Sequence, residues 1–404
     1  MANGTKIDDL LTQHTHFALT DPSKSDPPPW DTGPVSSEPF RSQEIYEAER
    51  DQIFKKVWLN VARGWEIPNP GDYVVKNLKV LNASIILVRG DDGTVRGFHN
   101  TCCHRGNKLI DPYKHPDSGS RRTFRCVFHG WTYNLEGQLI KVPDEEKFYN
   151  FEKSKCNLMP VHTGDWRGHI FINTDEQPTQ SLDEWMGEFG KRIAPYNFED
   201  FELAAQWEAT VECNYKVFID AFQETYHVSF IHSDSFTGEI DPDDPYFNMK
   251  YMHFFGPHKV LAVPGRGSPE TSVRTHAVMQ DGSVSTGINL DAVKDWGFDI
   301  DVIFPNYFLN MFDNQYFTHN FWPLGVDSTR WECRLYSPKP KNASHSIALE
   351  KEKVLLRDAI QEDLSTNEAT QASLNTGAMK ELYFSEQESG PRHHYHVMEN
   401  MLKL

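Results

Sequence analysis

The chain has 404 residues and a formal net charge of −18 at pH 7, and 38% of its residues are hydrophobic and 13% aromatic. This length and composition exclude a disordered protein and allow two domains with buried cores. The acidic balance disfavours nucleic acid and anionic membrane surfaces, and no apolar run, leader pattern or cysteine framework indicates membrane insertion or secretion. We therefore expect a cytoplasmic protein with neither nucleic acid nor membrane as a partner.

The N-terminal third predicts an arm followed by a β domain. Residues 1–40 are polar and proline-rich towards their end, which predicts an arm that runs over the surface. A helix is predicted next, with Ser42 as its N-cap. Short β-type runs punctuated by Gly, Asn and Asp then fill residues 73–173. We assign residues 41–175 to an all-β domain.

The remainder of the chain has a mixed pattern. The polar stretch "DEQPTQS" at residues 175–181 indicates a linker. Strand-like runs such as "HKVLAVPG" and "WECRLYSP" then alternate with helical patterns at about residues 180–193, 212–232 and 349–375. An α+β domain over residues 176–404 is predicted from this alternation.

Two Cys/His pairs lie in the β-rich region, each after a strand-like run. Cys102 and His104 have the spacing Cys-x-His, and Cys126 and His129 have the spacing Cys-x2-His. For one pair alone, a buried thiol beside an ordinary histidine is the simpler interpretation. Two pairs in neighbouring loops favour a metal site, and thiolates with imidazoles suit zinc or an iron–sulfur cluster.

The residues around the pairs favour the cluster. Gly106 and Gly130 allow backbone N–H groups to approach the sulfurs, and Trp131 can shield one side from water. Hydrogen bonds to sulfur and exclusion of water are the means by which proteins set a cluster's potential.

The two segments, "CCHRG" and "CVFHGWTY", resemble the loops of the Rieske [2Fe–2S] domain. The resemblance implies that Cys102 and Cys126 hold one iron while His104 and His129 hold the other. Cys103 occupies the variable position of the first motif, and we expect it to be a small buried residue. The segment between the two motifs is a few residues longer than is usual for such domains.

A second constellation lies in "NYKVFIDAFQETYHVSFIHSD". On one continuous helix, Asp220, Glu224 and His227 would share a face. His232 would lie roughly 140° further round an ideal helix, so both histidines can bind one metal only if the helix distorts or ends near Val228–Ile231. Alone, this is a weak signal, because a histidine on a core face is common.

This segment resembles the catalytic motif of Rieske non-haem iron oxygenases, acid-x3-acid-x2-His-x4-His. The resemblance implies that His227 and His232 bind the mononuclear iron, and that Glu224 and Asp220 are the motif's two catalytic acids. Many members have Asp where this chain has Glu224, and Glu or Asn where it has Asp220.

The third ligand must come from another segment. The helical pattern near residue 360 offers four acids, namely Asp358, Glu362, Asp363 and Glu368. Asp363 falls within the apolar sector of that helix, while Glu362 points away from it. The family pattern, an acid five residues before a Glu, also selects Asp363. The "RHHYH" segment near the C-terminus is expected to be solvated or interfacial.

The resemblance implies both fold and function. The expected fold is an all-β Rieske domain followed by a helix-grip-like α+β catalytic domain with an antiparallel sheet. The expected activity is that of a mono- or dioxygenase with a [2Fe–2S] cluster, mononuclear Fe(II) and O2 as co-substrate. A separate ferredoxin and/or NAD(P)H-dependent reductase would supply electrons, and the chain would form a homotrimer.

The sequence defines the substrate less closely than it defines the metal centres. We expect a small organic compound, aromatic by analogy with aromatic compound catabolism in the family. Hydroxylation, dihydroxylation and oxidative dealkylation all remain open, as does a β subunit. Two other functions also remain open: a zinc-stabilised interaction module, and a Rieske electron carrier without oxygenase activity.

Overall fold

The computed structural model of the protein describes residues 14–18, 28–232, 248–265, 286–294 and 296–402. Contacts divide the chain into two compact units. One unit comprises residues 54–185, and the other combines residues 1–53 with residues 186–404. Much of the predicted arm lies outside the described residues.

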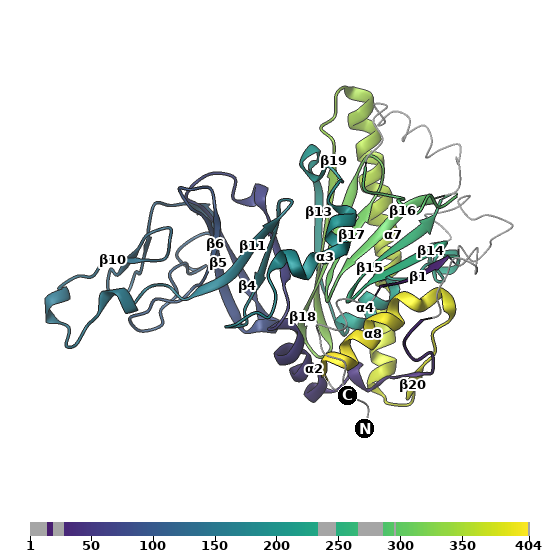
Figure 1. Cartoon of the computed structure of the whole chain (residues 1–404), viewed down its shortest axis with the longest axis horizontal. Coiled ribbons are helices and arrows are strands. Elements are labelled where there is room, and N and C mark those ends of the chain that lie inside the picture. The colour runs from purple at the N-terminus through teal and green to yellow at the C-terminus, as the bar shows by residue number, and fades with distance from the viewer. Residues whose placement is uncertain (1–13, 19–27, 233–247, 266–285, 295, 403–404) are drawn as a thin grey trace. The chain divides into compact units, whose positions relative to one another are not determined.

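The unit of residues 54–185 is built from antiparallel strands (Figure 1). A seven-stranded sheet has the order β3 Leu59–Arg63, β12 His169–Asn173, β11 Pro160–Trp166, β6 Val95–His99, β5 Ala83–Arg89, β4 Asp72–Leu78 and β7 Ser118–Ser120. A three-stranded sheet has the order β10 Leu139–Lys141, β9 Thr132–Tyr133 and β8 Phe124–Arg125.

The core of this unit follows from its apolar runs. Strand β5 has neighbours on both sides, and its residues Ile85 and Val88 are fully buried. One cluster of buried side chains also includes Cys102 and Cys126. The loops that carry the two cysteines are therefore anchored by the hydrophobic core of the unit, which supplies a rigid base for a metal site.

The larger unit contains an eight-stranded antiparallel sheet within the described residues. Its order is β1 His14–Ala18, β14 Tyr251–Phe255, β15 His258–Pro264, β16 Trp296–Ile303, β17 Tyr307–Met311, β18 Tyr316–Gly325, β19 Ser328–Ser337 and β13 Glu202–Val211. The central strand β17 is buried along its whole length. This burial explains why "NYFLNMF" is a nearly continuous apolar run rather than an alternating one.

Among the described residues, the α-helices are α2 Gln43–Glu49, α3 Leu182–Ile193, α4 Tyr215–Ala221, α5 Val228–Ile231, α7 Ala343–Asn375 and α8 Ser389–Leu402. Helix α4 contacts α7, α8 and strand β18. Lys259 on β15 donates from Nζ to the backbone oxygen of Gly390 on α8 at 2.7 Å. The sheet face that carries Lys259 is therefore the face that packs against helices.

The N-terminal residues differ from the prediction of a surface arm. Strand β1 pairs with β14, and strand β2, Val35–Ser36, pairs with β20, Glu381–Leu382. Trp30 and Phe40 are buried. Ser42 caps α2 as predicted, since its Oγ accepts from the backbone N of Ile45. Helix α2 belongs to the larger unit rather than to the unit of residues 54–185.

Two further expectations are wrong. The single helix expected at residues 212–232 is two short helices, because α4 ends at Ala221 and α5 begins only at Val228. The "RHHYH" segment, expected to be solvated or interfacial, is not solvated, since it lies within α8 and His393 and His394 are buried. The histidines pack among aromatic rings, including Phe254 and Phe304.

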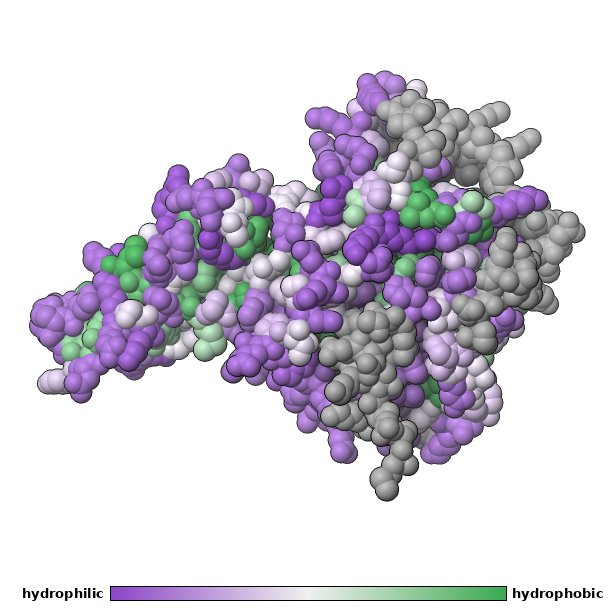
Figure 2. All heavy atoms as spheres, viewed as in Figure 1, coloured by the Kyte–Doolittle hydropathy of each residue, from purple (hydrophilic) through white to green (hydrophobic). Residues whose placement is uncertain are grey.

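Figure 2 shows a surface that is mostly hydrophilic on the face in view, with small separate hydrophobic patches. None of the helices in the described part of the chain has the length and apolar character needed to cross a bilayer.

Candidate metal centres

The two Cys/His loops of the unit of residues 54–185 share one backbone geometry. In the first loop, the N–H of Gly106 donates to the carbonyl of Cys102 at 3.0 Å, and the N–H of Cys102 donates to the carbonyl of Asn107 at 2.9 Å. In the second loop, the N–H of Gly130 donates to the carbonyl of Cys126 at 2.9 Å. Both glycines have φ of +76°, a left-handed conformation that favours glycine.

The loops divide their side chains between the interior and the surface. Cys102 and Cys126 are each only 2% exposed, whereas His129 is exposed and His104 is partly exposed. The two imidazole rings lie 4.7 Å apart. Trp131 is buried and stacks on the ring of His104 at 4.6 Å. Both pairs are therefore brought together, with the sulfurs inside and the imidazoles towards solvent.

This donor set fits the cluster that the motifs predict. Two buried thiols and two more exposed imidazoles match a [2Fe–2S] centre in which one iron has sulfur ligands and the other has histidine ligands. Burial raises the pKa of the Cys102 thiol. Burial, then His129 and Arg105, lower the pKa of His104, which favours the neutral ring that can bind a metal.

Tyr133 was not among the predicted site residues. Its hydroxyl lies 3.3 Å from the Cys102 sulfur and accepts from the backbone N of Cys103 at 3.1 Å. Tyr133 is fully buried, so this hydroxyl is positioned by the core. The sequence contained a signal for this residue, because Tyr133 is the last residue of the motif "HGWTY". A hydrogen bond to a cluster sulfur is one of the means of setting its potential.

Cys103 is exposed, so the expectation that it is a small buried residue is wrong. Its neighbours in sequence, Cys102 and His104, are held by the loop on either side of it.

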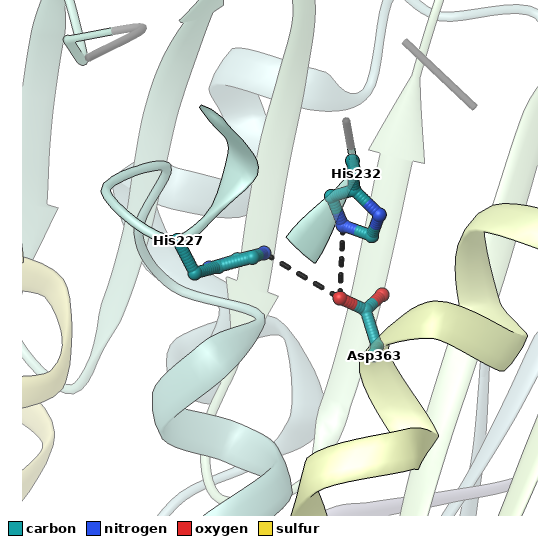
Figure 3. Close-up of side chains that lie close together, drawn as sticks. All are labelled: His227, His232 and Asp363. Carbon is teal, nitrogen blue, oxygen red and sulfur yellow. Dashed lines mark ion pairs between the residues drawn. The ribbon is translucent and has the colours of Figure 1, made fainter. Parts of the chain in front are cut away.

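The second site is a convergence of two histidines and one carboxylate in the larger unit. Figure 3 shows the imidazoles of His227 and His232 directed towards Asp363, which projects from α7. One donor atom from each of the three residues lies within 4.8 Å of the others. The distances from Asp363 Oδ1 to Nε2 of His227 and of His232 are 3.5 Å and 2.9 Å. The structure thus brings together the three residues predicted as iron ligands.

This arrangement fits a bound cation. Asp363 Oδ1 is buried and has no hydrogen-bond partner in the described part of the chain, although two ring nitrogens lie nearby. A buried carboxylate oxygen without a partner is costly unless a cation binds it. Two imidazoles and one carboxylate are the donor set that non-haem Fe(II) enzymes use, with positions left open for other ligands.

The other nitrogen of each imidazole is held by a glutamate. Nδ1 of His227 contacts Oε1 of Glu224, and Nδ1 of His232 lies 2.8 Å from Oε2 of Glu362. Such carboxylates place the ring proton on Nδ1 and leave Nε2 free to bind a metal. The sequence presents Glu362 only as a candidate ligand, and its position on the helical wheel, away from the apolar sector, argues against that role; its contact with His232 is not predicted.

The electrostatics of the triad also favour a positive charge. Burial opposes protonation of His227, but the carboxylates of Asp363 and Glu224 outweigh it and raise the pKa of the ring to about 10. Burial likewise opposes protonation of His232, and Asp363 and Glu362 raise its pKa. Burial tends to raise the pKa of Asp363, yet the two imidazoles lower it overall. A bound divalent cation would supply the positive charge next to these carboxylates that protonated imidazoles would otherwise supply.

Local chain geometry explains how His227 and Glu224 meet. Asn214 caps α4, and its backbone N donates to Oε1 of Gln371 on α7 at 2.8 Å. Helix α4 is thereby tied to the helix that carries Asp363. After α4 ends, a turn brings Oε2 of Glu224 within 3.2 Å of the backbone N of His227.

Asp220 lies apart from this geometry. It is still in α4, and its Oδ2 accepts from the hydroxyl of Tyr395 on α8 at 2.7 Å. Because the helix ends between them, Asp220 and Glu224 do not share the single helical face that was expected. Burial raises the pKa of Asp220 to about 8, with Tyr395, Lys216 and Lys259 acting in the opposite direction.

The remaining acids of α7 have other contacts. Asp358 pairs with Arg357 at 2.7 Å, and both side chains are about half exposed. Glu368 is exposed, and its Oε1 accepts from the backbone N of Glu212 at 3.3 Å. Neither residue belongs to the group of ligands that converges on one point among the described residues.

Comparison with known families agrees with both sites. A model described as the ring hydroxylating alpha subunit (catalytic domain) matches residues 198–404, and a Rieske [2Fe-2S] domain model matches residues 57–156. The chain belongs to the ring hydroxylating alpha subunit family. It thus combines a domain for a Rieske [2Fe–2S] cluster with a catalytic domain for mononuclear iron.

Individual curated relatives share about a third of their residues with this chain over the matched segments. The carnitine monooxygenase oxygenase subunit of Acinetobacter pittii (strain PHEA-2) is 32% identical over 219 residues, 53% of this chain and 54% of the relative. The 2-aminobenzenesulfonate 2,3-dioxygenase subunit alpha of Alcaligenes sp. is 34% identical over 199 residues, 48% of each chain. The chain therefore spans about half the length of the curated relatives it matches.

The fold matches over a longer span. A crystal structure of a quaternary ammonium Rieske monooxygenase in complex with an inhibitor superimposes with a TM-score of 0.73. It is 21% identical in sequence, and the match covers 92% of this chain and 96% of the other. This likeness confirms the expected fold, a Rieske domain followed by an α+β catalytic domain with an antiparallel sheet.

Proposed function

We propose that the chain is the terminal oxygenase component of a multicomponent system that oxidises a small organic substrate with O2. The observation that carries this proposal is the convergence of His227, His232 and Asp363 in a chain that also contains the Cys/His loops. When bound, the cluster supplies single electrons and the mononuclear iron supplies O2 activation. The chain's own residues hold these groups and exclude water.

The electron source in this proposal is a separate ferredoxin and/or NAD(P)H-dependent reductase. The partly exposed ring of His104 supports this proposal, because it offers a docking protein a short route to the cluster, whereas the ring of His129 faces a neighbouring copy in the assembly proposed below. The buried sulfur side, which includes Tyr133, is closed to such contact.

The substrate class is proposed from chemistry shared with relatives. One relative is named for carnitine, a quaternary ammonium compound, and another for 2-aminobenzenesulfonate, an aromatic compound. The proposal therefore includes both alkyl and aryl substrates, and it does not retain aromatic compounds as the preferred class. Hydroxylation, dihydroxylation and oxidative dealkylation all use the same metal centres.

The proposed assembly is a homotrimer in which Glu224 links the cluster of one copy to the iron site of the next. In this arrangement Glu224 would contact His227 of its own copy and His129 of a neighbouring copy. Its two oxygens already accept from His227 and from the backbone N of Tyr226, but a carboxylate has about four lone-pair sites. Light scattering should give about three times the chain mass of 46.6 kDa, and a monomer would contradict the assembly.

The test of function is reconstitution. The purified chain, an NADH-dependent reductase and a ferredoxin are combined with a panel of quaternary ammonium and aromatic compounds. The proposal predicts O2 uptake and a hydroxylated or dealkylated product for at least one compound, both absent when His227→Ala replaces the wild type. Electron uptake by the cluster without O2 consumption on any compound would favour the electron carrier.

A further inference from the structure

The eight-stranded sheet of the larger unit carries a buried histidine that is not part of the metal triad. His319 on β18 pairs with Phe308 on β17, Phe308 pairs with Val302, and Val302 pairs with Lys259. Directly paired residues of an antiparallel sheet point to the same face. His319 therefore lies on the face of Lys259, which packs against α8 and against Gln223 at the end of α4.

The tautomer of His319 is fixed by one neighbour. The indole N–H of Trp331 donates to Nδ1 of His319 at 3.0 Å. The proton of the neutral ring must then lie on Nε2, which makes Nε2 a donor. His319 is fully buried, and its Nε2 has no hydrogen-bond partner in the part of the chain that the structure describes.

The surroundings of this N–H are apolar. The ring of Phe222 packs edge-on against His319 at 4.6 Å, and Phe317 and Phe321 lie within 5.7 Å. A histidine among aromatic rings is often only part of a core. In that case, however, its second nitrogen normally finds a partner, because a buried donor without one destabilises the fold.

A second donor without a partner lies on the same face. Asn310 is two residues from Phe308 on β17, so its side chain points to the same side as His319. Asn310 is 4% exposed, and its Nδ2 has no hydrogen-bond partner among the described residues. Two buried N–H donors thus lie diagonally across neighbouring strands.

The metal triad is close enough to affect His319. Burial lowers the pKa of His319 to about 3, and the carboxylate of Asp363 opposes that shift. Phe222, which contacts His319, is also five residues before His227 in the segment that joins α4 to α5. His319 therefore belongs to the surroundings of the iron site, and Asn310 lies diagonal to it on the neighbouring strand.

We propose that His319 Nε2–H and Asn310 Nδ2–H form an oxyanion-binding subsite that holds the carboxylate or sulfonate of the substrate. The aromatic rings around them contact its apolar part. This inference rests on the proposed function and narrows the substrate class to small organic acids. It also accounts for two donors that otherwise would be buried without acceptors.

The test compares matched probes by calorimetry with the anaerobic holoenzyme. Two pairs are used, 2-aminobenzenesulfonate with aniline and carnitine with choline, and only the first member of each pair has an oxyanion. Wild type should bind the oxyanion member of at least one pair about tenfold or more tightly than its partner. His319→Phe should abolish this preference, whereas His319→Gln, which retains an N–H donor, should keep part of it.

Two further variants complete the design. Asn310→Leu should also reduce the preference, and it replaces His319→Phe if that variant does not fold. Phe317→Leu is the control, because it removes a neighbouring ring without removing a donor and should weaken both members of a pair equally. Equal binding of both members by wild type, binding of none of the four probes, or an unchanged preference in Asn310→Leu and His319→Phe would overturn the inference.

Failure of this subsite is distinguishable from failure of the proposed function. Selective binding of oxyanion probes by a protein that never consumes O2 would support the subsite and contradict the oxygenase. Turnover of compounds without an oxyanion, with no preference in binding, would contradict only the subsite.

Discussion

Oε2 of Glu362 lies 2.8 Å from Nδ1 of His232, while Nε2 of the same ring lies 2.9 Å from Oδ1 of Asp363. Glu362 and Asp363 are adjacent on α7, so one helix both orients the imidazole and offers a ligand beside it. Glu224 plays the equivalent part for His227 from within its own loop. Each ring is thus fixed through Nδ1 and presents Nε2 to one point.

Glu362→Gln should weaken the iron site without removing it. An amide can still contact His232 but loses the charge that orients the ring and makes it a better ligand, so iron affinity should fall about 10–100-fold. Competition with a ferrous chelator measures this change. Equal affinity in mutant and wild type would show that the contact between Glu362 and His232 has no effect on the site.

Asp363→Ala should lose the mononuclear iron and activity but keep the visible spectrum of the Rieske cluster. The side chain supplies the only carboxylate in the converging group found among the described residues. Asp358→Ala is the matched control on the same helix, because Asp358 is about half exposed and pairs with Arg357 at the surface. Full iron content and turnover in Asp363→Ala would exclude Asp363 as the third ligand.

Glu224→Gln should keep both metal centres and slow electron transfer from the cluster to the iron. The carboxylate holds Nδ1 of His227, and in the proposed trimer it also reaches His129 of a neighbouring copy. Single-turnover kinetics from prereduced enzyme measure the rate of cluster reoxidation by O2 in the presence of substrate. A wild-type rate would contradict the linking role, and loss of both metals would instead identify Glu224 as a structural residue.

Asp220 should make folding stability depend on pH. Burial raises its pKa to about 8, with Tyr395, Lys216 and Lys259 opposing the shift and Glu388 adding to it. A carboxyl with a raised pKa contributes stability below its unfolded pKa of about 3.9, and this contribution is lost as pH rises through the folded value. The residue is partly exposed as a whole, but its Oδ1 is buried.

Asp220→Asn tests this dependence by denaturant unfolding between pH 5 and 9. The difference in unfolding free energy, wild type minus variant, should fall with pH at no more than about 1.4 kcal/mol per unit. The subtraction reduces the contribution of Lys259, whose pKa burial lowers and which is common to both proteins. A difference that does not change with pH would show that Asp220 is ionised throughout.

The ligands of the cluster could be predicted from the sequence because their geometry is local. Cys102 and Cys126 each begin a short turn that closes at a glycine with positive φ, and spacing alone encodes such turns. His227 and His232 were also recognisable from a local motif. The prediction of Asp363 needed two further arguments, because only the apolar sector of its helix and the family resemblance together selected it from four acids.

Other features depended on tertiary contacts that spacing does not encode. A helical wheel shows that Glu362 points away from the apolar sector, but not that His232 lies there. The end of α4 at Ala221 separates Asp220 from Glu224, and no strong breaker marks that position. The histidines of "RHHYH" are polar residues near a chain end, yet α8 is buried against the sheet.

The most direct test of the account is the metal content of the anaerobically purified chain. We predict about three iron atoms and two acid-labile sulfides per chain, two irons in the cluster and one at His227, His232 and Asp363. The protein should be red-brown. Two irons per chain would contradict the oxygenase and favour an electron carrier, and a colourless protein that contains zinc would contradict both metal centres.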